Sequence, residues 1–284
     1  MLSYRRYDDP VQISEYVVSR PRYPQKVFDM ILEYTKQQAI PCKSGKFPLA
    51  VDVGCGPGLM STSFLAPHFD KVLGIDISEA QIAEANANKE YDNIEYKVAH
   101  AESMPVEDKS VTLVQVATAL HWLDHEKFYR ECDRVLVAGG VIAAFSHYPD
   151  IQVIDHPNKD HLTRILREIQ VKITSNENPE YLLPNKYAAE YYKDPCLQIP
   201  YPDTQRYDDI FFPFHTTIAG IHRYYMTITC VRKFISSNED RKRWWKDIFD
   251  RIMEAYRTDN SESPLTIQFK VYLLLGRKPK IILE

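Results

Sequence analysis

Residues 49–58 read LAVDVGCGPG, an apolar run that passes directly into three glycines at alternate positions. Glycine lacks a Cβ atom and adopts positive φ, so the turn at Gly54, Gly56 and Gly58 can pass close to a ligand. A second apolar run, 72–75, ends at Asp76, where a carboxylate can accept hydrogen bonds from both hydroxyls of a ribose. This stretch therefore predicts a strand–turn–helix site for a nucleotide-type cofactor.

The spacing of the glycines distinguishes between cofactors. The dinucleotide fingerprint has its third glycine three residues after the second. Here Gly58 follows Gly56 by two residues, and Leu59 occupies the expected third position. The pattern therefore disfavours NAD and FAD, although a nicotinamide oxidoreductase remains an alternative that would bind a dinucleotide.

Three motifs in order resemble those of the class I S-adenosylmethionine-dependent methyltransferases: DVGCGPG at 52–58, GIDIS at 74–78 and AESMP at 101–105. The resemblance implies S-adenosylmethionine as the cofactor and S-adenosylhomocysteine as its product. It also implies that the glycines hold the methionine part, that Asp76 binds the ribose and that Ile77 packs on the adenine. Glu102 stands where aspartate is more usual. The implied cofactor-binding residues are Gly54, Gly56, Gly58, Asp76, Ile77, Ala101, Glu102 and Ala117.

Apolar runs alternate with helical patterns as far as residue 150, which favours a parallel sheet covered on both faces. Together with the resemblance, this predicts an α/β, Rossmann-like doubly wound fold with a mostly parallel seven-stranded sheet and helical cap insertions. Strands are expected at 49–53, 71–76, 93–99, 111–117 and 140–146, and helices at 27–37, 58–69, 78–88 and 125–136, with Ser78 as an N-cap.

The alternation stops after Ser146. An amphipathic helix is expected at 162–173, a strand at 209–214, helices at 217–234 and 241–256, and a final strand at 265–276. We expect one domain over residues 1–284. Its parts are an N-terminal lid segment at 1–45, a cofactor-binding core at 46–150, cap insertions at 150–205 and 217–260, and closing strands at 206–216 and 264–277.

The N-terminal region resembles that of small-molecule methyltransferases. Tyr16 with RPRYP at 20–24 is similar to the Y-x-x-x-R-P-x-Y-P opening of the trans-aconitate and ubiquinone-biosynthesis-like enzymes. Residues 219–229 are similar to a G-Y-L-R-T-W-S-type helix of the trans-aconitate group, but the aromatic residue and the serine are replaced. The resemblance therefore does not carry over a substrate.

Methyl transfer is an in-line displacement, so the protein mainly orients and desolvates the reactants. A hydroxyl acceptor needs a base, and His121, just after the fourth strand, is the candidate; the alternative is a histidine that packs or caps the next helix. His147 and His215 are weaker candidates for the base.

A carboxylate acceptor has no proton to lose and needs only a cation to position it, for which Arg20 or Arg223 is suited. Aromatic residues can line the acceptor pocket or belong to an ordinary core. The predicted acceptor-binding residues are Tyr16, Arg20, Tyr23, Trp122, Arg223 and Tyr224.

The composition excludes several other classes. A net charge of −4 over 284 residues, with no basic stripe beyond Arg241–Arg243, argues against nucleic acid as a partner. The five cysteines form no C-x-x-C pair, so neither a zinc site nor a disulfide framework is predicted, and no metal is expected. The N-terminus lacks an apolar signal region, and no run has the length of a membrane span. We expect a cytoplasmic enzyme with no membrane partner; its oligomeric state does not follow from the sequence.

The expected activity is methyl transfer to an oxygen, carboxylate or hydroxyl, of a small molecule. Two alternatives remain open at this stage. One is N-methylation of a small amine, and the other is a regulatory protein that binds S-adenosylmethionine without catalysis.

Overall fold

A computed structural model describes residues 19–39, 41–58 and 61–280. Within them, seven strands form one sheet in the order β3-β2-β1-β4-β5-β7-β6. Adjacent strands in the part β3-β2-β1-β4-β5 are parallel, and β7 runs antiparallel to both β5 and β6. The predicted mostly parallel α/β sheet is confirmed. The strands are β1 (Phe47–Val53), β2 (Phe69–Asp76), β3 (Ile94–Val98), β4 (Val111–Ala117), β5 (Leu136–Val153), β6 (Asp203–Thr217) and β7 (Pro264–Arg277).

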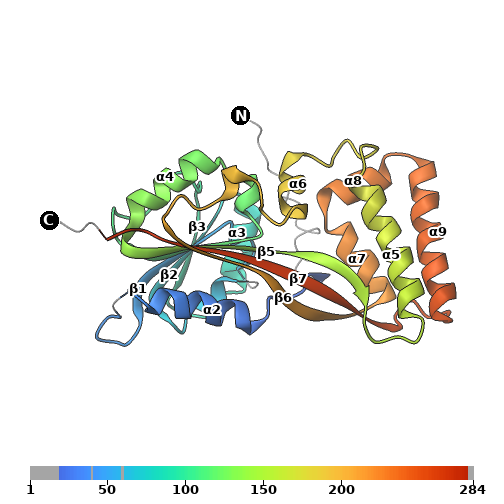
Figure 1. The fold of residues 1–284 in the computed structure, drawn as a ribbon, viewed down its shortest axis with the longest axis horizontal. Coiled ribbons are helices and arrows are strands. Elements are labelled where there is room, and N and C mark those ends of the chain that lie inside the picture. Colours follow the sequence, from blue (N-terminus) through green and yellow to red (C-terminus); the bar gives the residue numbers. More distant parts are fainter. Residues whose placement is uncertain (1–18, 40, 59–60, 281–284) are drawn as a thin grey trace.

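Helices cover both faces of the sheet, as the near-continuous apolar strands require. The amphipathic helix α2 (Gln25–Lys36) lies against one face and α4 (His125–Val135) against the other (Figure 1), and each packs into a separate hydrophobic cluster. Helix α3 (Glu79–Ala87) begins at Ser78, whose side chain accepts a hydrogen bond from the Gln81 backbone N–H as the sequence predicts. The parallel strands thus end together at one edge, beside the N-terminus of α3.

A cap stands at the far end of the molecule (Figure 1). Strands β5, β7 and β6 are long enough to leave the core and continue into it, pairing from Val141↔Arg277 to Val153↔Ile267. The strand expected at 140–146 is therefore much longer than its apolar run indicates. This continuity supports the proposal that the chain forms one domain. The remaining helices are α5 (Lys159–Ile173), α6 (Leu183–Ala189), α7 (Ile218–Met226), α8 (Thr229–Ser236) and α9 (Glu239–Tyr256), with short 3-10 turns η1 (Thr62–Leu65), η2 (Leu120–Trp122) and η3 (Pro195–Leu197).

Two predicted helices are wrong. In the described part of 58–69, only η1 forms, because the side chains of Ser61 and Thr62 bind the buried Asp52 carboxylate and Pro67 follows. The helix expected at 217–234 is split into α7 and α8. Its break lies at Thr227, whose hydroxyl donates to the Tyr224 carbonyl oxygen at 2.6 Å, and the next residue is extended.

A buried arginine fixes the N-terminal helix to the closing strands. Arg277 on β7 donates from Nε to Asp203 Oδ2 at 2.9 Å and from Nη2 to the Tyr34 carbonyl oxygen at 2.6 Å. These bonds join β7 and β6 to the last turn of α2.

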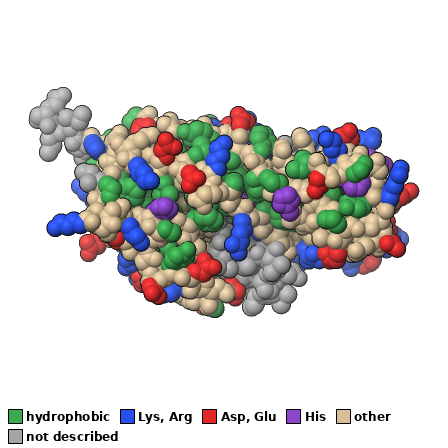
Figure 2. All heavy atoms as spheres, turned by 90° about the horizontal axis from the view of Figure 1, so that it is seen from below, with side chains coloured by type: hydrophobic (Ala, Val, Ile, Leu, Met, Phe, Trp, Pro, Cys, Tyr) green, Lys and Arg blue, Asp and Glu red, His purple; other side chains and the backbone are tan. Residues whose placement is uncertain are grey.

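The surface carries charges of both signs. On the face in Figure 2, acidic and basic side chains are interspersed without a patch of one sign. Among the residues that the structure describes, no helix is both long and apolar enough to cross a bilayer. In the same residues, no group of three or more His, Cys, Asp or Glu side chains could hold a metal ion.

Candidate functional site

A cavity of about 1250 Å³ opens at the carboxyl ends of the parallel strands, between the core and the cap. This is where ligands bind in doubly wound sheets. We call the part lined by the loops after β1, β2, β3 and β4 and by the first turns of α3 and α4 the core side. The part lined by Arg20, Tyr23, His147 and residues of α5, α6, α7 and α8 is the cap side. The cavity thus has room for two molecules at once, one against each side.

The glycine turn after β1 needs its glycines. Gly54, Gly56 and Gly58 have φ of +65°, +54° and +77°. A Cβ on Gly54 would lie 2.5 Å from that of Ala119, and one on Gly58 would lie 2.2 Å from the Tyr96 hydroxyl. Gly54 and Gly56 line the core side, whereas Gly58 does not and instead makes room for the buried Tyr96 ring.

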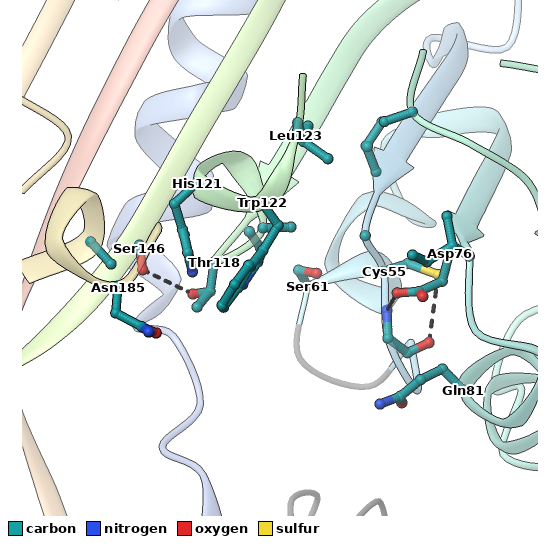
Figure 3. A pocket seen from close by; sticks show the side chains of 18 of the residues that line it. Cys55, Ser61, Asp76, Gln81, Thr118, His121, Trp122, Leu123, Ser146 and Asn185 are labelled. Atoms are coloured by element: carbon teal, nitrogen blue, oxygen red, sulfur yellow. Dashed lines mark hydrogen bonds between the residues drawn. The ribbon is translucent and has the colours of Figure 1, made fainter. Parts of the chain in front are cut away.

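Asp76 lies at the end of β2, directly beside this turn (Figure 3). Its Oδ2 accepts from the Gly56 backbone N–H at 3.0 Å, and its Oδ1 accepts from the Ser78 N–H at 2.9 Å. These bonds fix the carboxylate at the wall of the core side, where Ile77 also lies as a residue that is 38% exposed. The structure therefore brings together the predicted ribose and adenine contacts.

Gln81 on α3 is a core-side residue that the sequence analysis missed. Its side chain is buried and lines the cavity, yet its Oε1 has no hydrogen-bond partner in the described protein. A buried polar atom without a partner is costly, so this oxygen indicates a ligand with a hydrogen-bond donor. Only the position of Gln81 on the first turn of the helix, beside its cap, hints at this in the sequence.

The remaining predicted core-side residues also line the cavity. Ala101 is buried, and Glu102 Oε1 accepts from the Asp124 backbone N–H at 3.1 Å. Ala117 ends β4, and Trp122, which was predicted to bind the acceptor, follows it in η2 and also lines the cavity. The glycine turn, the Asp76 carboxylate and the unpartnered Gln81 oxygen together fit the adenosine and amino-acid parts of S-adenosylmethionine.

Asp52 lies behind the core side of the cavity, and the sequence analysis did not predict it either. It is fully buried on β1 and accepts from Ser61 Oγ at 2.8 Å, Thr62 Oγ1 at 2.6 Å and Gln115 Nε2 at 3.2 Å. Burial raises the pKa of this carboxyl group, while the three hydrogen bonds oppose the increase. An acid inside an apolar strand is the signal that could have identified it.

His121 lies in η2 at the junction of the two sides. Its Nδ1 is 2.6 Å from the Tyr192 hydroxyl, and the residue is 6% exposed. Burial lowers the pKa of His121 to about 3, so the imidazole is neutral near pH 7. The structure thus places the predicted catalytic residue in the cavity, as a very weak base.

A cluster of hydroxyl groups forms the floor beside His121. Thr118 has φ +54°, an uncommon conformation for a residue with a side chain, and its Oγ1 accepts from Ser146 Oγ at 3.2 Å (Figure 3). The Tyr23 hydroxyl contacts Thr118 Oγ1 and lies 3.1 Å from His147 Nδ1. Burial lowers the pKa of His147 to about 3 as well. Tyr23 is thus in the site as predicted, whereas Thr118 and Ser146 were not predicted as site residues.

Arg20 places a positive charge on the cap side. Its Nε donates to Thr227 Oγ1 at 2.9 Å, and its guanidinium lies 5.1 Å from the ring centre of Tyr224, which is buried and also lines the cavity. Tyr181 and Tyr225 extend this aromatic wall. Arg20 and Tyr224, which were predicted to bind the acceptor, thus both line the cavity.

The prediction for Arg223 is wrong. Arg223 does not line the cavity; its Nη1 is 2.9 Å from Glu262 Oε1, and both side chains are about half exposed. In α7, Tyr224 and Tyr225 are on the buried face that lines the cavity, whereas Arg223 is on the exposed face. His215, the weaker candidate, contacts Thr266 Oγ1 and also lies outside the cavity. Tyr16 is outside the described residues.

Comparison with known proteins shows that this chain is similar to methyltransferases. A family model described as a methyltransferase domain matches residues 51–144, which run from β1 into β5. A putative methyltransferase of Dictyostelium discoideum is 29% identical over 91% of this chain and 90% of its own length. The probable S-adenosylmethionine-dependent methyltransferase CRG1 of Saccharomyces cerevisiae is 23% identical over 91% of this chain and 93% of its own.

Two solved structures align with most of this chain. A putative type II methyltransferase from Anaeromyxobacter dehalogenans has a TM-score of 0.66 with 26% identity, over 92% of this chain and 99% of that one. The Haemonchus contortus phosphoethanolamine N-methyltransferase 2, solved with phosphomonomethylethanolamine and S-adenosylhomocysteine, has a TM-score of 0.50 at 14% identity. The alignment covers 98% of this chain and 59% of the Haemonchus contortus chain, so the two proteins have a common fold.

Proposed function

We propose that this chain, a class I S-adenosylmethionine-dependent methyltransferase, methylates a carboxylate oxygen of a mostly apolar small molecule. The distribution of charge in the cavity carries the proposal. Among the described lining residues, the acidic ones all lie on the core side: Asp76, Glu79, Glu102 and Asp124. The charged residue of the cap side is Arg20, which lies among tyrosines, aliphatic side chains and the amides of Gln170 and Asn185. The other lining cation, Lys127, pairs with Asp124 on the core side. A wall of this kind favours an anion on an apolar body over a cationic amine.

The neutral histidines support a carboxylate over a hydroxyl as the acceptor. A hydroxyl must lose its proton to a base, and a group with a pKa of about 3, such as His121 or His147, takes up a proton poorly near pH 7. A carboxylate arrives already deprotonated, because its own pKa is about 4.3. The chain then has only to hold it in line and exclude water.

The roles of the residues follow from their positions. S-adenosylmethionine, when bound, supplies a methyl group on a positively charged sulfur, which a carboxylate oxygen can accept as the carbon–sulfur bond breaks. Asp76 and the glycine turn hold the ribose and the amino-acid part. Arg20 pairs with the acceptor carboxylate through its planar guanidinium. The aromatic wall with Tyr224 packs on the apolar body of the acceptor and keeps water out.

The test is a screen of matched acceptors with the full chain and S-adenosylmethionine. Benzoate, cinnamate and octanoate are compared with the corresponding alcohols and amines, and mass spectrometry detects the methylated product together with S-adenosylhomocysteine. We expect methyl esters of the acids. The rate should be flat from about pH 6 to 8, since neither the carboxylate nor the neutral histidines titrate there. Methylation of only alcohols or amines, or of none of the three classes, contradicts the proposal.

Replacing Arg20 by leucine should raise the KM for the acid about tenfold, because a charge-assisted hydrogen bond is lost. The affinity for S-adenosylhomocysteine, measured by calorimetry, should not change, since Arg20 lies on the cap side. Arg223→Leu is the matched control. It removes an exposed arginine bound to Glu262 outside the cavity, so its KM should equal that of the wild type. Equal KM values for both variants would show that Arg20 does not bind the acceptor.

A further inference from the structure

The hydrogen bond between Tyr192 and His121 joins the cap to the reaction site across 71 residues of sequence. His121 lines the cavity, whereas Tyr192 is fully buried behind it and is not among the described lining residues. The 2.6 Å distance between Nδ1 and the phenol oxygen is short for such a pair. The contact therefore fixes one edge of the imidazole and leaves the edge with Nε2 on the cavity side.

Tyr192 is held firmly enough to fix that edge. It has φ +55°, a conformation that side-chain residues seldom adopt without support. Its carbonyl oxygen accepts from Gln198 Nε2 at 2.7 Å and from Arg206 Nη1 at 3.2 Å. Its ring packs edge to face on Tyr272, with the centres 4.8 Å apart. The chain thus maintains an unfavourable backbone conformation that directs this hydroxyl at His121.

The direction of the hydrogen bond determines which nitrogen of His121 carries the proton. Burial raises the pKa of Tyr192 far above its usual value, so the phenol keeps its hydrogen, and that buried hydrogen requires an acceptor. Among the residues that the structure describes, the hydrogen-bond partner of this hydroxyl is Nδ1 of His121. The phenol hydrogen is then donated to Nδ1, so the neutral ring carries its own hydrogen on Nε2.

We propose that Tyr192 is a positioning residue that holds His121 as the Nε2–H tautomer, so that His121 donates a hydrogen bond to the acceptor oxygen. The role at the acceptor rests on the proposed function. It replaces the base predicted from the sequence with a donor, which suits an acceptor that has no proton to lose. With Arg20, it orients the carboxylate so that one oxygen is bound and the other is directed at the methyl group.

The test determines the tautomer of His121 directly and does not require enzymatic activity. The full chain is labelled with nitrogen-15 at its nine histidines, and long-range proton–nitrogen correlation spectra show which ring nitrogen carries hydrogen. His121→Gln identifies the signals of His121. We expect the Nε2–H tautomer in the wild type and a mixture of both tautomers in Tyr192→Phe. The Nδ1–H tautomer in the wild type would overturn the proposal, and so would an unchanged His121 pattern in Tyr192→Phe.

Tyr129→Phe is the matched control. Its hydroxyl donates to the Leu197 carbonyl oxygen at 2.7 Å, so the variant also loses a buried phenol hydrogen bond, but outside the cavity. The His121 pattern should not change in it. With an acid identified by the screen, Tyr192→Phe should lower kcat on the order of tenfold, with unchanged affinity for S-adenosylhomocysteine. If no acid is methylated, the proposed function fails while the tautomer result still decides the role of Tyr192.

Discussion

Replacing Asp76 by alanine will weaken the binding of S-adenosylhomocysteine by roughly 10- to 100-fold, the loss expected for charge-assisted hydrogen bonds to the ribose. The carboxylate stands at the end of β2, held by the backbone N–H groups of Gly56 and Ser78. Alanine can neither bind a ribose hydroxyl nor hold the turn. Calorimetric titration of the purified chain measures the change, with circular dichroism to show that the variant is folded.

Two further variants separate the causes. Asp76→Asn keeps an oxygen that can accept from the turn but loses the charge, so its affinity should lie between those of the wild type and alanine. Glu95→Ala removes a carboxylate on the adjacent strand β3, where it pairs with Lys71 and Lys97 on the surface, and should bind normally. If Asp76→Ala stays within twofold of the wild type, Asp76 is not the ribose ligand.

The cofactor-binding core could be predicted because the residues that determine it are close together in the sequence. The glycine turn, Ser78 at the helix start and Asp76 lie within one βαβ unit, so their spacing along the chain determines their positions in space. Strand β4 has the bounds that its apolar run predicts. Such positions need no knowledge of distant contacts.

The helix expected at 58–69 shows where local information fails. Its apolar residues have helical spacing, but periodicity reports only which residues are buried, not what binds the polar ones. Asp52 on β1 takes the hydroxyls of Ser61 and Thr62, and the chain forms only a short 3-10 turn there. A buried acid on the neighbouring strand outweighs the helix propensity.

The cap side depends on contacts between distant parts of the chain. His121 was correctly selected for its place after β4, but its role depends on Tyr192, which nothing in the sequence connects to it. Thr227, at the break between α7 and α8, likewise binds Arg20, which is 207 residues away in the sequence. Arg223 and Tyr224 are adjacent in sequence, and only the packing of α7 decides which of them faces the cavity.

Gly54→Val should have the largest effect of all, with affinity for S-adenosylhomocysteine reduced on the order of 100-fold or more, since displacements of about 1 Å at a site can cost that much. Valine strongly disfavours the φ of +65° found at Gly54. Its Cβ would also lie 2.5 Å from the Cβ of Ala119, in the turn after β4 that lines the same cavity. Two walls of the core side must therefore shift at once. Calorimetry measures the loss of affinity, and thermal unfolding measures the strain.

Gly45→Val separates backbone strain from damage to the site. Gly45 has φ +80°, but a Cβ there meets no atom within 4 Å, and the residue lies in the turn before β1, outside the cavity. Both variants should lose stability, by about 1–2 kcal/mol from the left-handed conformation alone. Only Gly54→Val should lose the ligand, because only there does the added carbon displace the cavity wall. Equal affinities in the two variants would mean that the glycine turn serves the fold and not the cofactor.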